Sequence, residues 1–234
     1  MVCGQLACTD RNVLPLSSPA PLSYRLKTTN NVKSQSSPFS TEYTFDLTNR
    51  VTSFTTSMGT KAMITYDGQN RYERLNYSYR LADDTNGEII RFAYNSNDND
   101  FTQNTSFIKN GNPNGTLLSA TYKFDAKKRL VSMVKDGSVE TYRYTGDNIT
   151  RVDYIANGYT STTMYEYDDK LNPYYGLIAP DIGAIRRFSR NNSTKIINGT
   201  AAIEYVYQYN AQGLPIKITK NDGTLEVLLT YESY

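Results

Sequence analysis

The chain has 234 residues, and its 25 Lys and Arg against 23 Asp and Glu give a formal net charge of +2. This balance excludes a broad electrostatic attraction to nucleic acid or to an anionic membrane. Histidine is absent, which removes the commonest general base and metal ligand, and no run of 18 apolar residues predicts a membrane-spanning helix.

The first forty residues contain both cysteines, Cys3 and Cys8, so we expect no disulfide in the folded part. Leu6-Ala7-Cys8 resembles the end of a bacterial lipoprotein signal, in which a small residue precedes the cysteine that takes the lipid. Only seven residues precede Cys8, too few for such a signal, so Cys8 is either a lipid-attachment site or an incidental thiol. The Ser-, Pro-, Thr- and Asn-rich run over 12–40 is typical of a tether. We therefore predict a tether over 1–40 and a folded domain over 41–234.

From residue 41 onward, one motif returns: an aromatic, any residue, a second aromatic, and then an acid or amide. Its clearest copies are Tyr43-Thr44-Phe45-Asp46, Tyr122-Lys123-Phe124-Asp125, Tyr165-Glu166-Tyr167-Asp168 and Tyr207-Gln208-Tyr209-Asn210. Weaker copies raise the number to about nine, and Phe188 is assigned to one of them by spacing alone. Six of the eight intervals between second aromatics are 20 to 23 residues long, which indicates stacked supersecondary units.

Each unit has the alternation of a β-hairpin. Tyr122 and Phe124 fall on one face of an extended chain, and Lys123 and Asp125 fall on the other. Pairs such as Asp67-Gly68 accept the backbone angles of tight turns. Two strands of roughly seven residues per unit predict about sixteen to eighteen antiparallel strands and little helix. A round barrel of that size would leave a lumen too wide for side chains to fill, so we predict an all-β meander rolled into a flattened barrel or half-barrel.

These motifs resemble known repeats. The strings Tyr122 to Leu130 and Tyr43 to Val51 resemble the YD repeats of Rhs-type proteins. The segment from Tyr165 to Tyr174, with its Asn172-Pro173-Tyr174, is closer to short lipoproteins of Bacteroidota-type bacteria, a family of unknown function described as porin-like in fold. The resemblance covers about 40–234 and departs at the fourth motif position, which is Thr145 in one unit and Ser189 in another, and in intervals of 28 and 30 residues. It implies a porin-like β fold and an extracytoplasmic, outer-membrane-anchored setting, and it brings no catalytic residues.

The recurring acids are the main candidates for chemistry. Asp46, Asp67, Asp125 and Asp168 could form a carboxylate pair of the kind that hydrolyses glycosides. Because the acid recurs in unit after unit, we expect instead that it accepts backbone N–H groups in the turn that follows. The oxygen-rich stretch over 95–100 lacks the Gly and Glu of an EF-hand and is interpreted as a polar hairpin tip. We predict no catalytic residue, no cofactor and no metal site.

Tyrosine is the remaining candidate for function, with 21 copies and no Trp in the chain. We expect the motif tyrosines to line the core, whereas Tyr174 and Tyr175 interrupt the repeat and are the predicted binding residues. The predicted function is a monomeric, non-catalytic cell-envelope lipoprotein domain that binds a protein partner or a glycan. The alternative is an envelope carbohydrate-active enzyme with paired carboxylates. A membrane pore is disfavoured because its strands would need about 9 to 11 residues.

Overall fold

The computed structural model describes residues 24–33, 39–80, 83–95, 100–177 and 184–234. The strands and the single helix of these residues are β1 (Tyr24–Lys33), β2 (Phe39–Phe45), β3 (Val51–Thr56), β4 (Lys61–Tyr66), β5 (Tyr72–Arg80), β6 (Asp83–Tyr94), β7 (Asp100–Lys109), β8 (Asn112–Phe124), β9 (Leu130–Lys135), β10 (Ser138–Thr145), β11 (Asn148–Ala156), β12 (Tyr159–Leu171), α1 (Ala184–Phe188), β13 (Asn191–Asn198), β14 (Ala201–Tyr209), β15 (Pro215–Lys220) and β16 (Glu226–Ser233).

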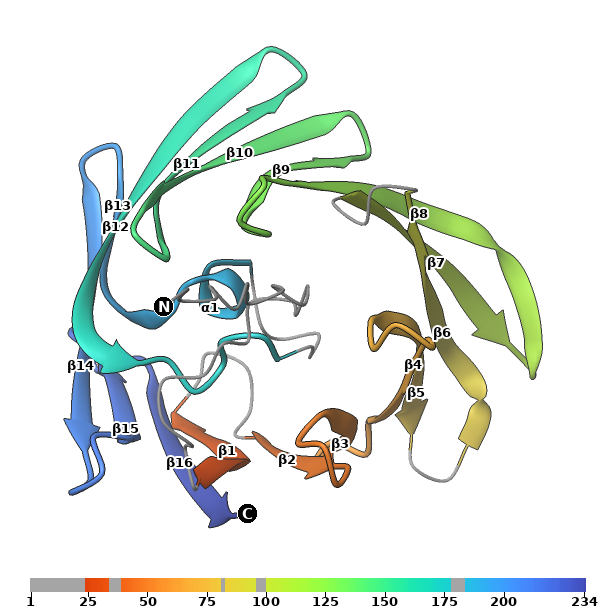
Figure 1. Cartoon of the computed structure of the whole chain (residues 1–234), viewed down its shortest axis with the longest axis horizontal. Coiled ribbons are helices and arrows are strands. Elements are labelled where there is room, and N and C mark those ends of the chain that lie inside the picture. Colours follow the sequence, from red (N-terminus) through yellow and green to blue (C-terminus); the bar gives the residue numbers. More distant parts are fainter. Residues whose placement is uncertain (1–23, 34–38, 81–82, 96–99, 178–183) are drawn as a thin grey trace, which may run out of the picture.

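These sixteen described strands form one closed antiparallel barrel in which each strand pairs with its neighbours in the chain (Figure 1). The all-β meander, its strand number and its low helix content are therefore confirmed, and the sheet closes fully rather than stopping as a half-barrel. Figure 1 shows α1 inside the ring of strands. The connection between β12 and β13 thus enters the lumen, which the side chains of the strands do not fill alone.

Closure depends on β1, which lies in the stretch predicted to be a tether. It pairs with β16 from Tyr24 opposite Ser233 to Lys33 opposite Glu226, and it also pairs with β2. Residues 24–33 therefore belong to the folded domain, contrary to the predicted boundary at 41. A register shift after Leu26 interrupts its alternation, and β1 carries no aromatic pair, so the repeat search missed it. Cys8 lies outside the described residues.

Two other details differ from the expected repeat. Phe188 ends α1 and is not part of a strand, so the copy placed there by spacing alone is wrong. The two long intervals are extensions of hairpins: β5, β6, β7 and β8 have 9, 12, 10 and 13 residues, longer than the seven expected.

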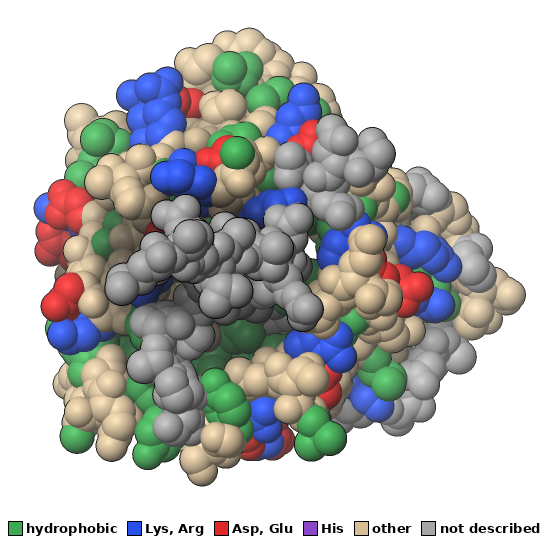
Figure 2. Space-filling view, viewed as in Figure 1, with side chains coloured by type: hydrophobic (Ala, Val, Ile, Leu, Met, Phe, Trp, Pro, Cys, Tyr) green, Lys and Arg blue, Asp and Glu red, His purple; other side chains and the backbone are tan. Residues whose placement is uncertain are grey.

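The motif aromatics face the lumen, and many of the charged residues face outward. Inward-facing Tyr43 and Phe54 are 0% and 1% exposed and belong to a core cluster that Tyr207 and Tyr231 also contact. On the outer face, ion pairs join neighbouring strands, among them Lys195–Glu204 at 3.0 Å and Lys217–Glu226 at 3.1 Å. Lys and Arg are interspersed with Asp and Glu around the ring (Figure 2).

The recurring aspartate organises the turn after its strand. Asp67 Oδ1 accepts the N–H groups of Gln69 and Arg71, both at 2.9 Å, and its Oδ2 accepts Arg71 Nε at 2.8 Å. Asn70, between them, has a positive φ of 67°, which Asn tolerates well. Asp46 and Asp125 make the same bonds with the arginine four residues later. The prediction that the acid accepts backbone N–H groups of its own turn is confirmed.

The arginine of each turn reaches the next repeat. The Arg50 guanidinium lies 4.4 Å from the centre of the Tyr66 ring, and that of Arg71 lies 4.1 Å from the Tyr94 ring. The Tyr66 hydroxyl donates to the Val51 carbonyl at 2.8 Å, and Tyr94 donates to the Tyr72 carbonyl at 3.0 Å. Successive repeats are therefore locked in register by the same residues that define the motif.

The turn contacts of the recurring aspartates also lower the pKa values of their carboxyl groups. Burial acts to raise the pKa of Asp46, but hydrogen bonds from the Arg50 backbone and side chain and from Thr48 outweigh it and lower that pKa to about 2. The pKa of Asp67 is lowered in the same way by Arg71 and Gln69, again against the effect of burial. Both turns therefore hold their aspartate in the charged form.

Candidate functional site: a polar groove beside the lumen insertion

The insertion between β12 and β13 is shaped by Asn172. Its Oδ1 accepts the Tyr174 N–H at 2.9 Å, and its Nδ2 donates to the carbonyl oxygens of Arg186 and Ser189 at 2.5 and 2.8 Å. The Tyr175 N–H donates to the Asn172 carbonyl at 3.1 Å, which closes a tight turn. One buried amide thus connects the two ends of the insertion, which gives Asn172-Pro173-Tyr174 a structural role.

The insertion is fastened to both sides of the barrel. Ser189 is fully buried, and its Oγ accepts the Ile149 N–H of β11 at 3.1 Å and lies 2.9 Å from the Tyr167 hydroxyl of β12. From the other side, the Tyr72 hydroxyl of β5 donates to the Gly176 carbonyl at 2.8 Å. These bonds fix the segment that carries the two predicted binding tyrosines.

The two tyrosines have different surroundings. Tyr174 is 5% exposed and packs in the core cluster with the strands around it, so in this structure its ring is a packing element. Tyr175 is 36% exposed. Burial raises the pKa of the Tyr175 hydroxyl, the Asp147 charge adds to that rise, and the Arg190 charge opposes it. The Tyr175 hydroxyl therefore lies within electrostatic reach of both charges.

Asp147 and Arg190 belong to a polar groove with a volume of about 390 Å³. The groove is formed by the β10–β11 turn, the end of β12 and the start of β13. Its lining residues are Thr145, Gly146, Asp147, Asn148, Asp169, Leu171, Arg190 and Asn191. A second void, beside the insertion, has a volume of about 10 Å³, roughly that of one water molecule, and is too small for an organic ligand.

Reciprocal bonds keep the walls of the groove in place. Asn148 Nδ2 donates to Asn191 Oδ1 at 2.9 Å, and the Asn191 N–H donates to Asn148 Oδ1 at 2.9 Å. Arg190 donates through its N–H to the Asp147 carbonyl at 3.2 Å and through Nη1 to the Asp147 carboxylate at 3.4 Å. Arg129 Nη1 donates to the Gly146 carbonyl at 2.9 Å, so a motif arginine supports the groove from the preceding repeat.

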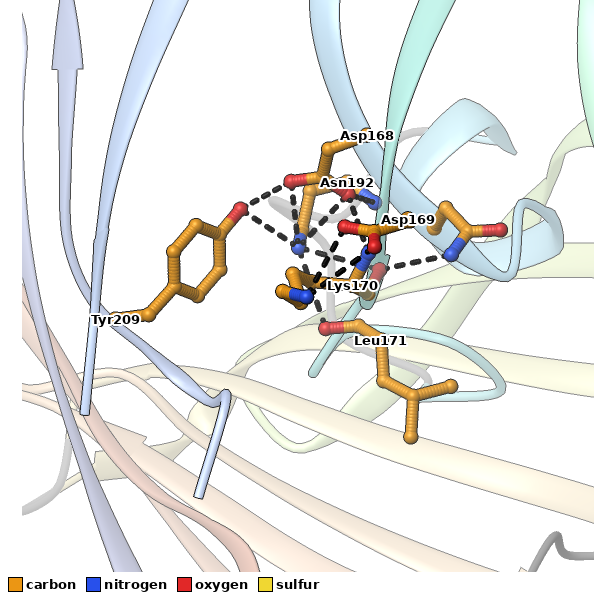
Figure 3. A network of polar contacts seen from close by, with 7 residues as sticks. Asp168, Asp169, Lys170, Leu171, Asn192 and Tyr209 are labelled. Atoms are coloured by element: carbon orange, nitrogen blue, oxygen red, sulfur yellow. Dashed lines mark hydrogen bonds and ion pairs between the residues drawn. The ribbon is translucent and has the colours of Figure 1, made fainter. Parts of the chain in front are cut away.

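The fourth motif acid, Asp168, precedes the groove residue Asp169 and lies in a modified turn (Figure 3). Its Oδ1 accepts the Lys170 N–H at 3.0 Å and the Asn192 N–H at 3.2 Å, and the Tyr209 hydroxyl donates to its Oδ2. Asn192 of β13 thus occupies the place that the arginine takes in other repeats. Burial and the Asp168 charge raise the pKa of Tyr209. The neighbouring Asp169 lines the groove instead, and 84% of its side chain is exposed.

The groove therefore presents two carboxylates, one guanidinium, two amides and a nearby phenol. Such groups form hydrogen bonds to hydroxyl-rich or charged ligands. In the described part of the chain, no group of three or more His, Cys, Asp or Glu is arranged to hold a metal ion. Within the same residues, no helix has the length and apolar character required to cross a bilayer.

Sequence reasoning found the insertion but missed most of the groove. Asp147, Arg190 and Asn191 carry no motif of their own, and Asp147 and Arg190 are 43 positions apart in the chain. The one available signal was the interruption of the repeat on both sides of the insertion, because loops that break a repeat often form binding surfaces.

Comparisons with known proteins show limited similarity in sequence and in structure. No protein-family model matches the sequence. The chain is 29% identical over 137 residues to the tRNA3(Ser)-specific nuclease WapA of Bacillus spizizenii, covering 56% of this chain and 6% of that protein. A porin-like protein from Bacteroides uniformis ATCC 8492 superposes with a TM-score of 0.47 at 13% identity, covering 90% of this chain and 96% of that one. A chain of the TcdB2-TccC3-Cdc42 structure gives a TM-score of 0.22 at 13% identity, covering 79% of this chain and 14% of that one. None of these matches assigns the chain to a family, and the architecture rests on its own strand pairing.

Proposed function

We propose that this chain is a non-catalytic binding domain of a cell-envelope lipoprotein, and that its polar groove receives a glycan. The observation that carries the proposal is a groove lined by two carboxylates, a guanidinium and two amides. The charges of Asp147 and Arg190 in this groove also act on the Tyr175 hydroxyl. A tyrosine ring stacks on the apolar face of a sugar, while carboxylate, amide and guanidinium groups bind its hydroxyls. A protein partner is the competing ligand, and because it would need about 800 Å² of surface, it would also contact residues outside the groove.

The bonding of the motif acids supports a non-catalytic role. Asp46, Asp67 and Asp125 are each held by two backbone N–H groups and an arginine, and Asp168 is held by two backbone N–H groups and Tyr209. Carboxylates committed in this way organise turns and are not available as an acid and base pair.

An enzyme acting on carbohydrate remains the second candidate, because Asp147 and Asp169 line the same groove. A glycosidase acid is usually enclosed by apolar groups, whereas 56% of the Asp147 side chain and 84% of the Asp169 side chain are exposed. Incubation with a panel of polysaccharides, followed by measurement of reducing ends, separates the two functions. Release of sugar that Asp147→Asn and Asp169→Asn both abolish would establish the enzyme; we expect no release.

A glycan array tests the binding proposal. We compare the wild type with Tyr175→Ala, Asn148→Ala and the control Tyr159→Ala, which removes a tyrosine that is 63% exposed on the β11–β12 hairpin. We expect Tyr175→Ala and Asn148→Ala to lose the glycans that the wild type retains, and Tyr159→Ala to keep them. Equal binding by all four proteins would reject the groove as the site. A pull-down that captures one protein only with an intact Tyr175 would favour a protein partner.

The location is proposed from the sequence. Labelling with radioactive palmitate in the native host, with Cys8→Ser as the control, tests lipid attachment at Cys8. Gel filtration tests the monomeric state. Nuclease activity is not proposed, because the match to the Bacillus protein covers 6% of that protein and the net charge of +2 offers nucleic acid little attraction.

A further inference from the structure

Arg187 in α1 differs from the arginines of the motif turns. Arg50, Arg71 and Arg129 each pair with the aspartate four residues earlier. Arg187 is half-buried, and its guanidinium makes no ion pair or hydrogen bond with the residues that the structure describes. A partly buried charge without a partner is unfavourable, because the cost of removing it from water is not offset. Arg187 therefore offers five N–H donors that the described residues leave unused.

Two aromatic rings lie close to this guanidinium, one from strand β5 of the barrel wall and one from α1 itself. The guanidinium lies 5.7 Å from the centre of the Tyr72 ring and 4.9 Å from that of Phe188. Burial raises the pKa of Tyr72, Tyr94 and Tyr122, and the Arg187 charge opposes the rise in all three. The guanidinium thus lies beside Tyr72 of β5, and its charge also acts on Tyr94 of β6 and Tyr122 of β8.

The tyrosine hydroxyls around Arg187 already have acceptors. Tyr72 donates to the Gly176 carbonyl at 2.8 Å, Tyr94 donates to the Tyr72 carbonyl at 3.0 Å, and Tyr122 donates to Gln103 Oε1 at 3.3 Å. Phe101 stacks on one face of the Tyr122 ring, with 4.6 Å between the ring centres, and the Arg71 guanidinium covers one face of the Tyr94 ring, so each of these two rings has one face left for a ligand. The free donors at this place come from the guanidinium, beside aromatic faces on which a ring-shaped ligand can stack.

We propose that Arg187 binds a carboxylate carried on a ring-shaped body, inside the barrel and apart from the groove. A carboxylate matches the planar guanidinium with two parallel hydrogen bonds. A single positive charge suits a monoanion better than a doubly charged phosphate, and Glu140, whose charge also acts on Tyr122, adds to that preference. The body of the ligand is either a uronic acid sugar or an aromatic acid, since both present a ring to the tyrosines.

Titration calorimetry of the full chain tests this proposal with sodium glucuronate and sodium benzoate, with glucose and inorganic phosphate as controls. We expect one carboxylate to bind with a dissociation constant in about the millimolar range, and glucose and phosphate to bind much more weakly. The carboxylate that binds more tightly identifies the body of the ligand.

The variants locate the site. Arg187→Gln removes the charge and is expected to weaken carboxylate binding about ten-fold or more. The control Arg143→Gln, which changes an arginine of β10 that is 68% exposed and belongs to neither proposed site, is expected to leave it unchanged. Arg187→Lys keeps the charge without the planar pair and is expected to give an intermediate loss; it also serves as the informative variant if Arg187→Gln unfolds. Unchanged affinity in both Arg187 variants overturns the proposal, as does tighter binding of phosphate. Absence of carboxylate binding by the wild type up to about 50 mM, well above millimolar affinity, also overturns it. None of these outcomes depends on the glycan array.

Discussion

Replacement of Asp67 with alanine or asparagine separates the two contributions of the recurring aspartate. Alanine removes the acceptor of two backbone N–H groups and the partner of Arg71. Asparagine keeps one side-chain oxygen for the backbone and loses the charge. The chain already contains this second arrangement, because Asn210 Oδ1 accepts the N–H groups of Gln212 and Leu214 at 3.1 and 2.9 Å without an arginine.

The magnitudes follow from the partners. The loss of two hydrogen bonds to a carboxylate, 23% exposed, is expected to lower the free energy of unfolding by about 2–3 kcal/mol in Asp67→Ala. Loss of the ion pair near the surface, with the backbone bonds retained, is expected to cost about 0.5–1 kcal/mol in Asp67→Asn. For a domain of this size, the melting temperature should fall by about 5–10 °C in the first variant and about 1–4 °C in the second.

Thermal and urea unfolding followed by circular dichroism measure both variants. The double change Asp67→Asn with Arg71→Gln should lower the free energy of unfolding by less than the sum of the two single changes. The difference is the coupling energy of the ion pair, expected to be about 1 kcal/mol or less. If Asp67→Asn proves as destabilising as Asp67→Ala, the backbone bonds contribute nothing beyond the ion pair, and the account of the turn given above is refuted.

Three further predictions follow from single contacts. The pKa of Asp46 is about 2 in the folded protein and about 3.9 in an unfolded chain, so its contribution to the free energy of unfolding is complete above about pH 4 and is lost as the pH falls toward 2. Urea unfolding at several pH values should therefore show that the stability of Asp46→Asn falls less steeply at acid pH than that of the wild type. A Cβ added to Gly87 would lie 1.9 Å from the Tyr77 carbonyl oxygen, whereas a Cβ added to Gly68 would have no atom within 4 Å. Gly87→Ala should therefore lower the free energy of unfolding by more than about 2 kcal/mol, and Gly68→Ala by less than about 0.5 kcal/mol. Equal melting temperatures of the two variants would contradict this. Removal of the buried Tyr174 ring in Tyr174→Ala should cost about 3–5 kcal/mol, and an unfolding midpoint equal to that of the wild type would show that the insertion does not need this ring.

The groove, the lumen site and the motif turns are connected by direct contacts or by a shared segment of the chain. A motif arginine, Arg129, supports the groove through the Gly146 carbonyl, and the insertion that carries Tyr175 also carries Arg187. Changes that loosen the insertion, such as loss of the Ser189 bond to Ile149, should therefore weaken both proposed sites at once. Changes confined to Tyr175 or to Arg187 should affect one site each.

Local chemistry determined the repeat from the sequence alone. Alternation of Tyr122 and Phe124 with Lys123 and Asp125 fixes which side of a strand leaves water, because successive side chains point to opposite faces. The aspartate turn is equally local, since Asp67 bonds to residues two and four positions later. These short-range rules were enough to predict an antiparallel meander with the observed number of strands.

Closure and the sites were decided by the tertiary structure. Arg25 and Glu232 form an ion pair 207 positions apart, and β1 became a strand because the edge of β16 offers it unpaired backbone groups, although its own sequence reads as a tether. The insertion entered the lumen because a closed ring of this width leaves space that strand side chains cannot fill. Asp147 and Arg190 come together only as a result. The sequence by itself determined how each hairpin forms and which face it buries, whereas the meeting of distant residues depends on how the hairpins close on one another, and a local pattern does not encode that.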